Sequence, residues 1–409
     1  MSGPLSTAEH IEAAVAALGP GDLDERGVRA HLAPLFSRVL ARSEIYLANH
    51  SLGRPLDASA RDVAEAMELW QLRMGEAWEG WLEEMDAYRA RFAALLGATE
   101  PRCVVPKASA GQGVRAVLNA LNGVPHVVAT RGEFDSVDVI LREYALRGLI
   151  RLTLVEPCEH GLYNADDVRA ALRPGADLVV LSSVIFNTGQ RMPELASLVT
   201  EARRTGARVL LDVYHEMGVL PLDITAIDAD IAVGGSYKYL RGGPGACFLY
   251  LHPRLLDGSF RTLDIGWFAK ADRFTYQRPD PPALAEGGDA WLESTPAVLP
   301  FYQARAGQLF TLTLGVQRLR SYGLDRLRRL RRALDACGIE SEGADEAHGG
   351  FLVVRLEPSR AKAWVADLAR RGVRVDARGG YVRFCPDVLT TADEIGRAAM
   401  LAGESLRAL

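Results

Sequence analysis

One lysine in this sequence has neighbours that an ordinary surface lysine would not need. Lys238 lies within AVGGSYKYLRGGPG (residues 232–245), between a serine–tyrosine pair and a glycine-rich turn, directly after an apolar run. Asp212 ends an earlier apolar run, ARVLLD, and His215 follows three residues later. An aspartate at the end of a buried strand is costly unless it meets a positive partner. Pyridoxal phosphate is a cofactor that needs two such groups. One is a lysine that bonds covalently to it, and the other is a carboxylate that keeps its pyridine nitrogen protonated.

Two further segments offer the other contacts that such a cofactor requires. In PKASAGQGVRAVL, the small residues Ser109, Ala110 and Gly111 separate a strand-like run from a helix-like one, and their N–H groups would point at an anion. In GEFDSVD, Phe134 follows another apolar run and could stack on a flat ring. Each feature alone has a structural explanation. Asp212 could form a salt bridge, the small residues could form an ordinary turn, and Phe134 could belong to the core. Their order favours pyridoxal phosphate over a nucleotide, because no GxGxxG follows a strand and no GxxxxGKS/T is present.

The hydrophobic pattern indicates the elements that must position these residues. Short apolar runs alternate with amphipathic segments of helical periodicity. Unbroken Val, Ile and Leu runs between helices predict a mostly parallel sheet covered on both faces, with functional groups at the carboxyl ends of its strands. We therefore predict an α/β fold with a seven-stranded sheet, whose strands are RCVVP, PHVVAT, IRLTLV, ADLVVLSSV, ARVLLD, ADIAVGG and ACFLYL.

The chain is expected to divide into three parts, because 409 residues are too many for one ordinary core. Residues 1–60 are mostly helical and are expected to pack with the small domain. Residues 61–300 would form the large cofactor-binding domain, and residues 301–409 a smaller C-terminal α/β domain. Between about residues 60 and 96, apolar residues recur at three- and four-residue spacing, which predicts a helix ending at Gly97.

Composition narrows the class of protein. The chain is 48% hydrophobic and 24% charged, and its small net charge of −5 gives no reason to expect nucleic acid or a membrane surface as partner. Its five cysteines are scattered and never form a CxxC pair, which argues against disulfides and against a metal site. The first residues include acids and lack a basic region before an apolar run, so we expect no signal peptide and a cytoplasmic location.

With these motifs the chain resembles the fold-type-I pyridoxal-phosphate enzymes of the class V aminotransferase group, and within that group the kynureninases. The resemblance covers nearly the whole chain. SYKYLRGGPG and GWF are its specific motifs, whereas NTGQ and the small-residue turn also occur in cysteine desulfurases and related lyases. The matching segments are YLANHSLGRPL, AWEGWLEEMDAYRARFAALLGA, NTGQ, DVYHEMG, SYKYLRGGPG, GWF, STPAVL and VRF. The resemblance implies an amino acid as substrate and a homodimer with shared active sites.

The resemblance also implies a role for each matching residue. Lys238 would bond to the cofactor and later move the Cα proton, Asp212 would pair with the pyridine nitrogen, and Tyr237 would bind the phosphate and act as an acid. Trp267 and Thr295 would reach the cofactor or substrate across a dimer interface. Arg383 would bind the α-carboxylate of the substrate, a role that suits its guanidinium. The other implied contacts are those of Ala110 and Gly111 with the phosphate, of Phe134 and His215 with the cofactor, and of His50 with the substrate.

Three positions depart from the family pattern. His50 stands where the family motif has asparagine, and the phosphate turn reads ASAGQG where a Ser/Thr-rich sequence is usual. After Phe134 no acid stands at the family's spacing, because Asp135 comes two residues early and Asp138 one residue late. These departures concern the substrate and the phosphate rather than the cofactor chemistry.

The leading hypothesis is a hydrolase that cleaves the Cβ–Cγ bond of kynurenine, or of a related amino acid, to alanine and an aromatic acid. The alternative is a class V aminotransferase or another pyridoxal-phosphate lyase acting on a different amino acid. A desulfurase needs a cysteine shortly before the carboxylate-binding arginine, whereas Cys337 lies far upstream of Arg383 and Cys385 follows it. Lys238, Asp212 and Arg383 together argue against a non-catalytic protein of this fold.

Overall fold

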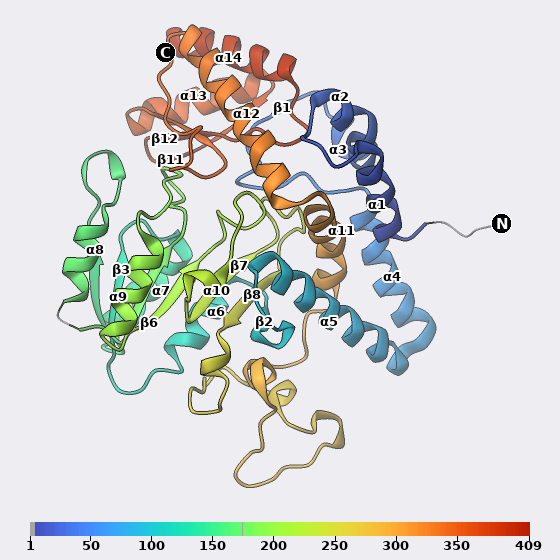
Figure 1. Cartoon of the computed structure of the whole chain (residues 1–409), viewed down its shortest axis with the longest axis vertical. Helices are drawn as coiled ribbons and strands as arrows, with labels where there is room; N and C mark the ends of the chain where they lie inside the picture. The colour runs from blue at the N-terminus through green and yellow to red at the C-terminus, as the bar shows by residue number, and fades with distance from the viewer. Residues whose placement is uncertain (1–4, 174) are drawn as a thin grey trace.

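The computed structural model describes residues 5–173 and 175–409 (Figure 1). Its α-helices are α1 (Thr7–Leu18), α2 (Glu25–Gly27), α3 (Ser37–Leu40), α4 (Ala58–Arg73), α5 (Ala77–Leu96), α6 (Ala110–Leu118), α7 (Asp135–Leu146), α8 (Ala165–Leu172), α9 (Leu195–Arg204), α10 (Ile224–Ile227), α11 (Leu299–Leu314), α12 (Val316–Ala336), α13 (Pro358–Arg370) and α14 (Ala392–Arg407). Its strands are β1 (Ile45–Tyr46), β2 (Val104–Lys107), β3 (His126–Thr130), β4 (Arg151–Val155), β5 (Leu178–Ser182), β6 (Arg208–Asp212), β7 (Ile231–Gly235), β8 (Cys247–Leu251), β9 (Leu352–Arg355), β10 (Val373–Arg374), β11 (Asp376–Arg378) and β12 (Tyr381–Phe384).

The large sheet has seven strands in the order β2-β8-β7-β6-β5-β3-β4. β8 is antiparallel to both of its neighbours, and the other adjacent pairs are parallel. The seven apolar runs form these seven strands, which confirms the predicted, mostly parallel sheet. Ser182 of β5 pairs with Asp212 of β6, and Asp212 pairs with Val233 of β7, so the carboxyl ends of these strands lie at one edge of the sheet.

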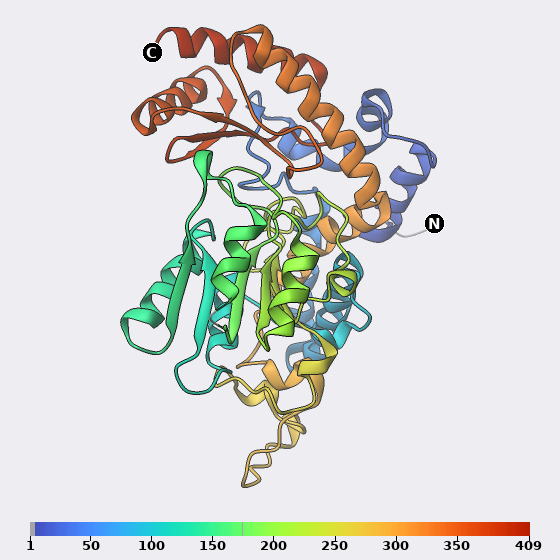
Figure 2. The same ribbon diagram turned by 60° about the vertical axis from the view of Figure 1, so that its left-hand side comes forward.

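Helices cover both faces of this sheet (Figure 1, Figure 2). The side chains of β5 alternate between the two layers. Val179 and Leu181 pack in the cluster that holds α5, α8, α9 and α11, whereas Leu178 and Val180 pack in the cluster that holds α6 and α7. Because both faces are buried, the strands carry continuous apolar runs rather than alternating ones.

The C-terminal part forms a second α/β unit. β11, β12 and β9 form an antiparallel sheet, and α12, α13 and α14 contribute to its apolar core. The N-terminal part joins this unit, because Ile45 of β1 pairs in parallel with Val373 of β10. Figure 1 shows the blue N-terminal helices beside the orange and red C-terminal helices, while the yellow segment that precedes α11 extends at the opposite end.

One helical stretch is interrupted where the periodicity predicts continuity. The helix expected between residues 60 and 96 is in fact α4 and α5, which are separated at Met74, a residue with a φ of 48°. Gly97 ends α5 with a φ of 67°, a left-handed conformation that glycine adopts without steric cost. No helix in the described part of the chain is long and apolar enough to cross a membrane.

Candidate active site

The residues expected to carry the chemistry come together at the carboxyl ends of the central strands. Asp212 is the last residue of β6, and Lys238 follows the end of β7 by three residues. Both line a cavity of about 210 Å³, together with Phe134, His215 and the start of α6. This is the edge at which functional groups of parallel sheets collect.

Lys238 is buried at this edge, and its Nζ lies 2.6 Å from Nε2 of His215. Burial lowers the pKa of Lys238 to about 7, although the negative charge of Asp212 acts in the opposite direction. At neutral pH a large fraction of the amine is therefore unprotonated, which is the form that attacks a carbonyl carbon. Aromatic rings surround the amine, because its nitrogen lies 4.7 Å from the ring centre of Tyr214 and 5.3 Å from that of Phe134.

His215 and Asp212 are buried beside Lys238. Burial, together with the nearby positive charge of Lys238, places the pKa of His215 well below its usual value, so its imidazole is neutral. Nδ1 of His215 is buried and has no hydrogen-bond partner within residues 5–173 and 175–409. Burial raises the pKa of Asp212, while a hydrogen bond from the N–H of Tyr214 to its Oδ1 (2.9 Å) lowers it. A cation bound against Asp212 would favour the ionised carboxylate further.

The expected phosphate cradle is the start of α6. Ser109 precedes this helix in an extended conformation, and its hydroxyl accepts a hydrogen bond from the N–H of Gln112 (3.1 Å). The N–H groups of Ala110 and Gly111 have no acceptor earlier in the helix, and the positive end of the helix dipole lies at the same place. A Cβ on Gly111 would lie 3.0 Å from Cδ1 of Ile140, which leaves little room for a larger residue. The turn therefore fits an anionic group such as a phosphate.

The residues around this cavity fit pyridoxal phosphate. They supply a buried amine for the aldehyde carbon, a carboxylate for the ring nitrogen and a helix N-terminus for the phosphate. They also supply a histidine nitrogen that has no partner in the described part of the chain. Tyr237 lines the same cavity, and its ring centre lies 4.9 Å from that of Tyr214. Burial raises the pKa of Tyr237, so its hydroxyl keeps its proton at neutral pH and is available as a hydrogen-bond donor.

The two residues expected to bind the substrate meet at a third, Asp376, which sequence reasoning missed. Arg383 donates two hydrogen bonds to the carboxylate of Asp376, from Nε (2.9 Å) and from Nη2 (2.6 Å), and a third from Nη1 to the carbonyl oxygen of Phe186 (2.6 Å). Nε2 of His50 contacts the same carboxylate at 2.7 Å. Burial lowers the pKa of His50 to about 4, so this ring is neutral. Asp376 and Arg383 face each other in the register of β11 and β12, so the sheet itself imposes their pairing.

Trp267 and Thr295 lie together but do not line the cavity of Lys238. Nε1 of Trp267 donates a hydrogen bond to Oγ1 of Thr295 (3.2 Å). Thr295 lines a separate cavity of about 170 Å³, together with Lys107 and Glu293. The role expected of these two residues involves a second subunit and stays a prediction.

Glu133 is a buried acid that does not itself line the cavity but bonds to Ser182, which does, and sequence reasoning did not select it. Its carboxylate accepts hydrogen bonds from Oγ1 of Thr130 (2.7 Å) and from Oγ of Ser182 (2.6 Å). Burial raises the pKa of Glu133 to about 7, and the negative charge of Asp212 adds to this shift. The family spacing places the expected acid after Phe134, whereas Glu133 directly precedes it. The available signal was an acid three residues after the end of the predicted strand PHVVAT.

Known proteins are similar to this chain in sequence. Residues 74–379 match the model of the family described as Aminotransferase class-V. The kynureninase of Deinococcus radiodurans is 30% identical over 287 residues, which cover 68% of this chain and 67% of that protein. The kynureninase of Geobacillus thermodenitrificans is 25% identical over 401 residues, which cover 91% of this chain and 90% of that protein.

Solved structures share the fold. A mutant of the protein C-DES, with glycine covalently linked to its PLP cofactor, matches with a TM-score of 0.79 at 21% identity, covering 90% of this chain and 98% of that one. A cysteine desulfurase from Thermococcus onnurineus matches with a TM-score of 0.77 at 19% identity, covering 91% and 96% of the two chains. The chain thus belongs to the class V aminotransferase family, has the fold of the type-I enzymes, and uses pyridoxal phosphate as its cofactor.

Proposed function

We propose that this protein is a hydrolase that cleaves the Cβ–Cγ bond of kynurenine, or of a closely related amino acid, to alanine and an aromatic acid. The observation that carries the proposal is a buried lysine amine in a cavity with aromatic walls. Phe134, Phe186, Tyr214 and Tyr237 all line that cavity, which suits an aromatic side chain next to a flat cofactor. The kynureninase that aligns over 91% of the chain supports the same substrate class.

In this mechanism the chain's own residues bind the amino acid and move its protons. Pyridoxal phosphate, when bound, supplies the electron sink that makes bonds near Cα labile. Lys238 accepts the Cα proton on Nζ, for which its pKa of about 7 is well matched near neutral pH. The protonated hydroxyl of Tyr237 belongs to a residue that adjoins Lys238 and lines the same cavity, and we assign it the return of a proton. Water supplies the oxygen that the aromatic acid gains when the Cβ–Cγ bond breaks.

Arg383 is proposed to hold the substrate's α-carboxylate. A guanidinium has five N–H groups, and the three hydrogen bonds to Asp376 and Phe186 leave two of them for a ligand. Asp376 and Phe186 fix the plane of the guanidinium, so the remaining N–H groups point in a set direction before substrate arrives. His50 contributes by holding the other side of this arrangement through the same carboxylate.

A desulfurase reaction is less well supported by the thiols of this chain. Cys247 lines the cavity, but burial raises its pKa to about 11, so it is a poor nucleophile at neutral pH. Burial also raises the pKa of Cys385, which follows Arg383. The exposed Cys158 does not line the cavity, and the hydrogen bond to Asp167 raises its pKa.

The test is a product assay with purified protein, pyridoxal phosphate and either kynurenine or 3-hydroxykynurenine. We expect alanine and anthranilate, or its hydroxylated form, in equal amounts. Release of no aromatic acid from either compound would remove the substrate assignment. Formation of glutamate from 2-oxoglutarate, without an aromatic acid, would identify the alternative, a class V aminotransferase. Turnover of a different amino acid without either product would identify another lyase of this family.

The same proposal includes a homodimer in which Trp267 and Thr295 complete the neighbouring subunit's site. Both residues lie outside the cavity of their own chain, and the nearby Leu263 is 82% exposed. Light scattering of the purified protein should give the mass of two chains. A monomer that is fully active would contradict this part of the proposal.

A further inference from the structure

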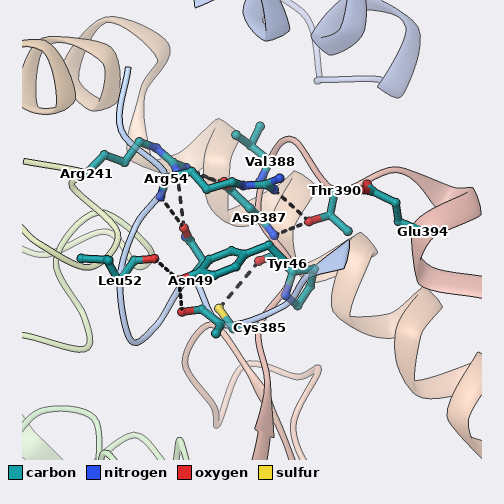
Figure 3. Close-up of polar contacts among 12 residues, drawn as sticks. Tyr46, Asn49, Leu52, Arg54, Arg241, Cys385, Asp387, Val388, Thr390 and Glu394 are labelled. Atoms are coloured by element: carbon teal, nitrogen blue, oxygen red, sulfur yellow. Dashed lines mark hydrogen bonds and ion pairs between the residues drawn. The ribbon is translucent and has the colours of Figure 1, made fainter. Parts of the chain in front are cut away.

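Next to the turn that carries Lys238, one carboxylate is buried between two arginines (Figure 3). Arg241 donates two hydrogen bonds to Asp387, from Nη2 to Oδ1 (2.6 Å) and from Nη1 to Oδ2 (3.0 Å). Nε of Arg54 donates a third, to Oδ2, at 2.9 Å. Burial alone would raise the pKa of Asp387, but the two guanidinium groups lower it to about 2, so the carboxylate is ionised at neutral pH.

The three residues of this cluster come from three distant parts of the chain. Arg54 belongs to the N-terminal segment, Arg241 follows Lys238 by three residues, and Asp387 follows Arg383 by four. Thr390 completes the cluster, because its hydroxyl accepts a hydrogen bond from Nη2 of Arg54 (3.2 Å) and another from the N–H of Asp387 (2.8 Å). The cluster therefore ties the turn after β7 directly to the chain that leaves β12 (Figure 3).

The turn itself has little freedom. The N–H of Gly53 donates to the carbonyl oxygen of Tyr237 (2.7 Å), and the N–H of Arg241 donates to the carbonyl oxygen of Lys238 (3.1 Å). A Cβ on Gly53 would collide with the same Lys238 oxygen. Arg241 has a φ of 58°, a left-handed conformation that residues other than glycine rarely adopt. Such a conformation persists only where the surroundings impose it, and it occurs preferentially at functional sites.

Stability alone is a poor reason for this arrangement. Two cations share one anion, so the cluster keeps a net positive charge in the interior, and buried ionic groups stabilise less than apolar residues of the same size. The N-terminal and C-terminal parts are also joined elsewhere. Arg326 of α12 is equally buried and pairs with Glu25 at 2.8 Å, and its hydrogen bonds go to Glu25 and Asp325 rather than to the lysine turn.

We propose that Arg241 and Asp387 are positioning residues that hold the Lys238 turn in register with the strand that carries Arg383. The amine that takes the Cα proton and the guanidinium that holds the α-carboxylate belong to different domains, so their separation needs a fixed link. Arg241 and Asp387 form the link, and Arg54 holds it from the N-terminal side. This inference rests on the roles that the proposed function gives to Lys238 and Arg383.

The experiment compares the holoenzymes of wild type, Arg241→Gln, Arg241→Lys and Asp387→Asn. Three quantities are measured: kcat and KM with kynurenine, the pH midpoint of the absorbance change of the bound cofactor, and the melting temperature. In Arg241→Gln we expect kcat to fall by about tenfold or more while KM changes by less than about threefold, because a displaced reacting group affects the chemical step more than binding. The absorbance midpoint should shift in the same variant, and Arg241→Lys should lie between it and wild type.

Arg326→Gln is the matched control. It removes an equally buried arginine that joins the N-terminal part to α12, away from the Lys238 turn, so it should lower the melting temperature but leave kcat and the absorbance midpoint as in wild type. If Arg241→Gln behaves like Arg326→Gln, the cluster is only structural and the inference is wrong. If Asp387→Asn does not fold, Arg241→Lys decides. If wild type does not turn over kynurenine, the proposed function fails, but the absorbance midpoints still test the inference.

Discussion

The molecule holds two groups of charges around its site, and they are built differently. The first group lies at the ends of neighbouring parallel strands and consists of Lys238, Asp212 and His215. Burial shifts the pKa of each in the direction that favours its neutral form. In the second group, Asp376 is paired by His50 and Arg383, which lower its pKa although burial opposes them. In the first group, the charges are not fully balanced by opposite charges nearby. In the second group, the carboxylate of Asp376 is already paired with Arg383 before any ligand binds.

This difference matches the two tasks of the proposed reaction. A group that gives and takes protons needs a pKa near the working pH, and incomplete compensation provides it. A group that holds a carboxylate needs a fixed geometry and a permanent charge, and pairing with Asp376 provides the geometry. The two groups also lie on different sheets. Asp212 of the first group ends a strand of the seven-stranded sheet, whereas Asp376 and Arg383 of the second group pair in the three-stranded sheet.

The largest effect is expected from Asp212→Asn, which removes the charge from the first group and keeps its shape. We expect kcat to fall by about 100- to 1,000-fold, because a buried charge aimed at the reacting system contributes on that scale. Asp230→Asn is the control. Asp230 is also a buried carboxylate next to this sheet, but it precedes β7 and binds the N–H of Val209 and Arg254. Asp230→Asn should lower stability without a comparable loss of kcat. An equal loss of kcat in both variants would contradict the distinct role of the first group.

A smaller effect, on stability, is expected from Asp376→Asn in the second group. It leaves Arg383 buried without its anion, and urea unfolding at pH 7 should show a loss of about 3 kcal/mol, the lower end for a broken buried pair. Because the pKa of Asp376 is lowered in the folded state, its contribution is present above the unfolded pKa and is lost as the pH falls below about 4. The variant should lack that acid-dependent loss. The double variant with Arg383→Gln should recover part of the stability, and no recovery would show that the pair is not coupled.

The smallest effect is expected from Glu133→Gln. The pKa of Glu133 is raised from 4.5 to about 7, so the folded state binds more protons than the unfolded state between these values. Wild-type stability should therefore fall by at most about 3 kcal/mol as the pH rises through this window. The variant, which stays neutral, should not show this fall, and kcat should change little. A pH profile of stability identical to that of wild type would contradict the raised pKa.

Sequence reasoning could predict the first group because one rule of fold geometry connects its members. Apolar runs identify the strands, and the carboxyl ends of parallel strands meet at one edge, so Asp212 and Lys238 are expected together. Glu133 follows the same rule and was available to it. The predicted sheet was confirmed because the apolar runs form its seven strands. The resemblance to the class V family was confirmed because the family model matches residues 74–379.

The second group and the link at Asp387 could not be predicted in this way. Asp376 meets Arg383 through the register of a hairpin, and a shift by one residue would place them on opposite faces. Arg54, Arg241 and Asp387 meet because three loops come together, and loops have no periodicity to reveal it. The break at Met74 likewise depends on one residue with a positive φ inside a regular helical pattern.

The central claim is that Lys238 is the residue that bonds to pyridoxal phosphate. The most direct measurement is borohydride reduction of the holoenzyme, followed by digestion and mass spectrometry. We predict the pyridoxyl group on the peptide that contains Lys238 and no label in Lys238→Ala. Lys107 is the other buried lysine near the site, where it pairs with Glu293. A label on Lys107, or no label on Lys238, would contradict the account.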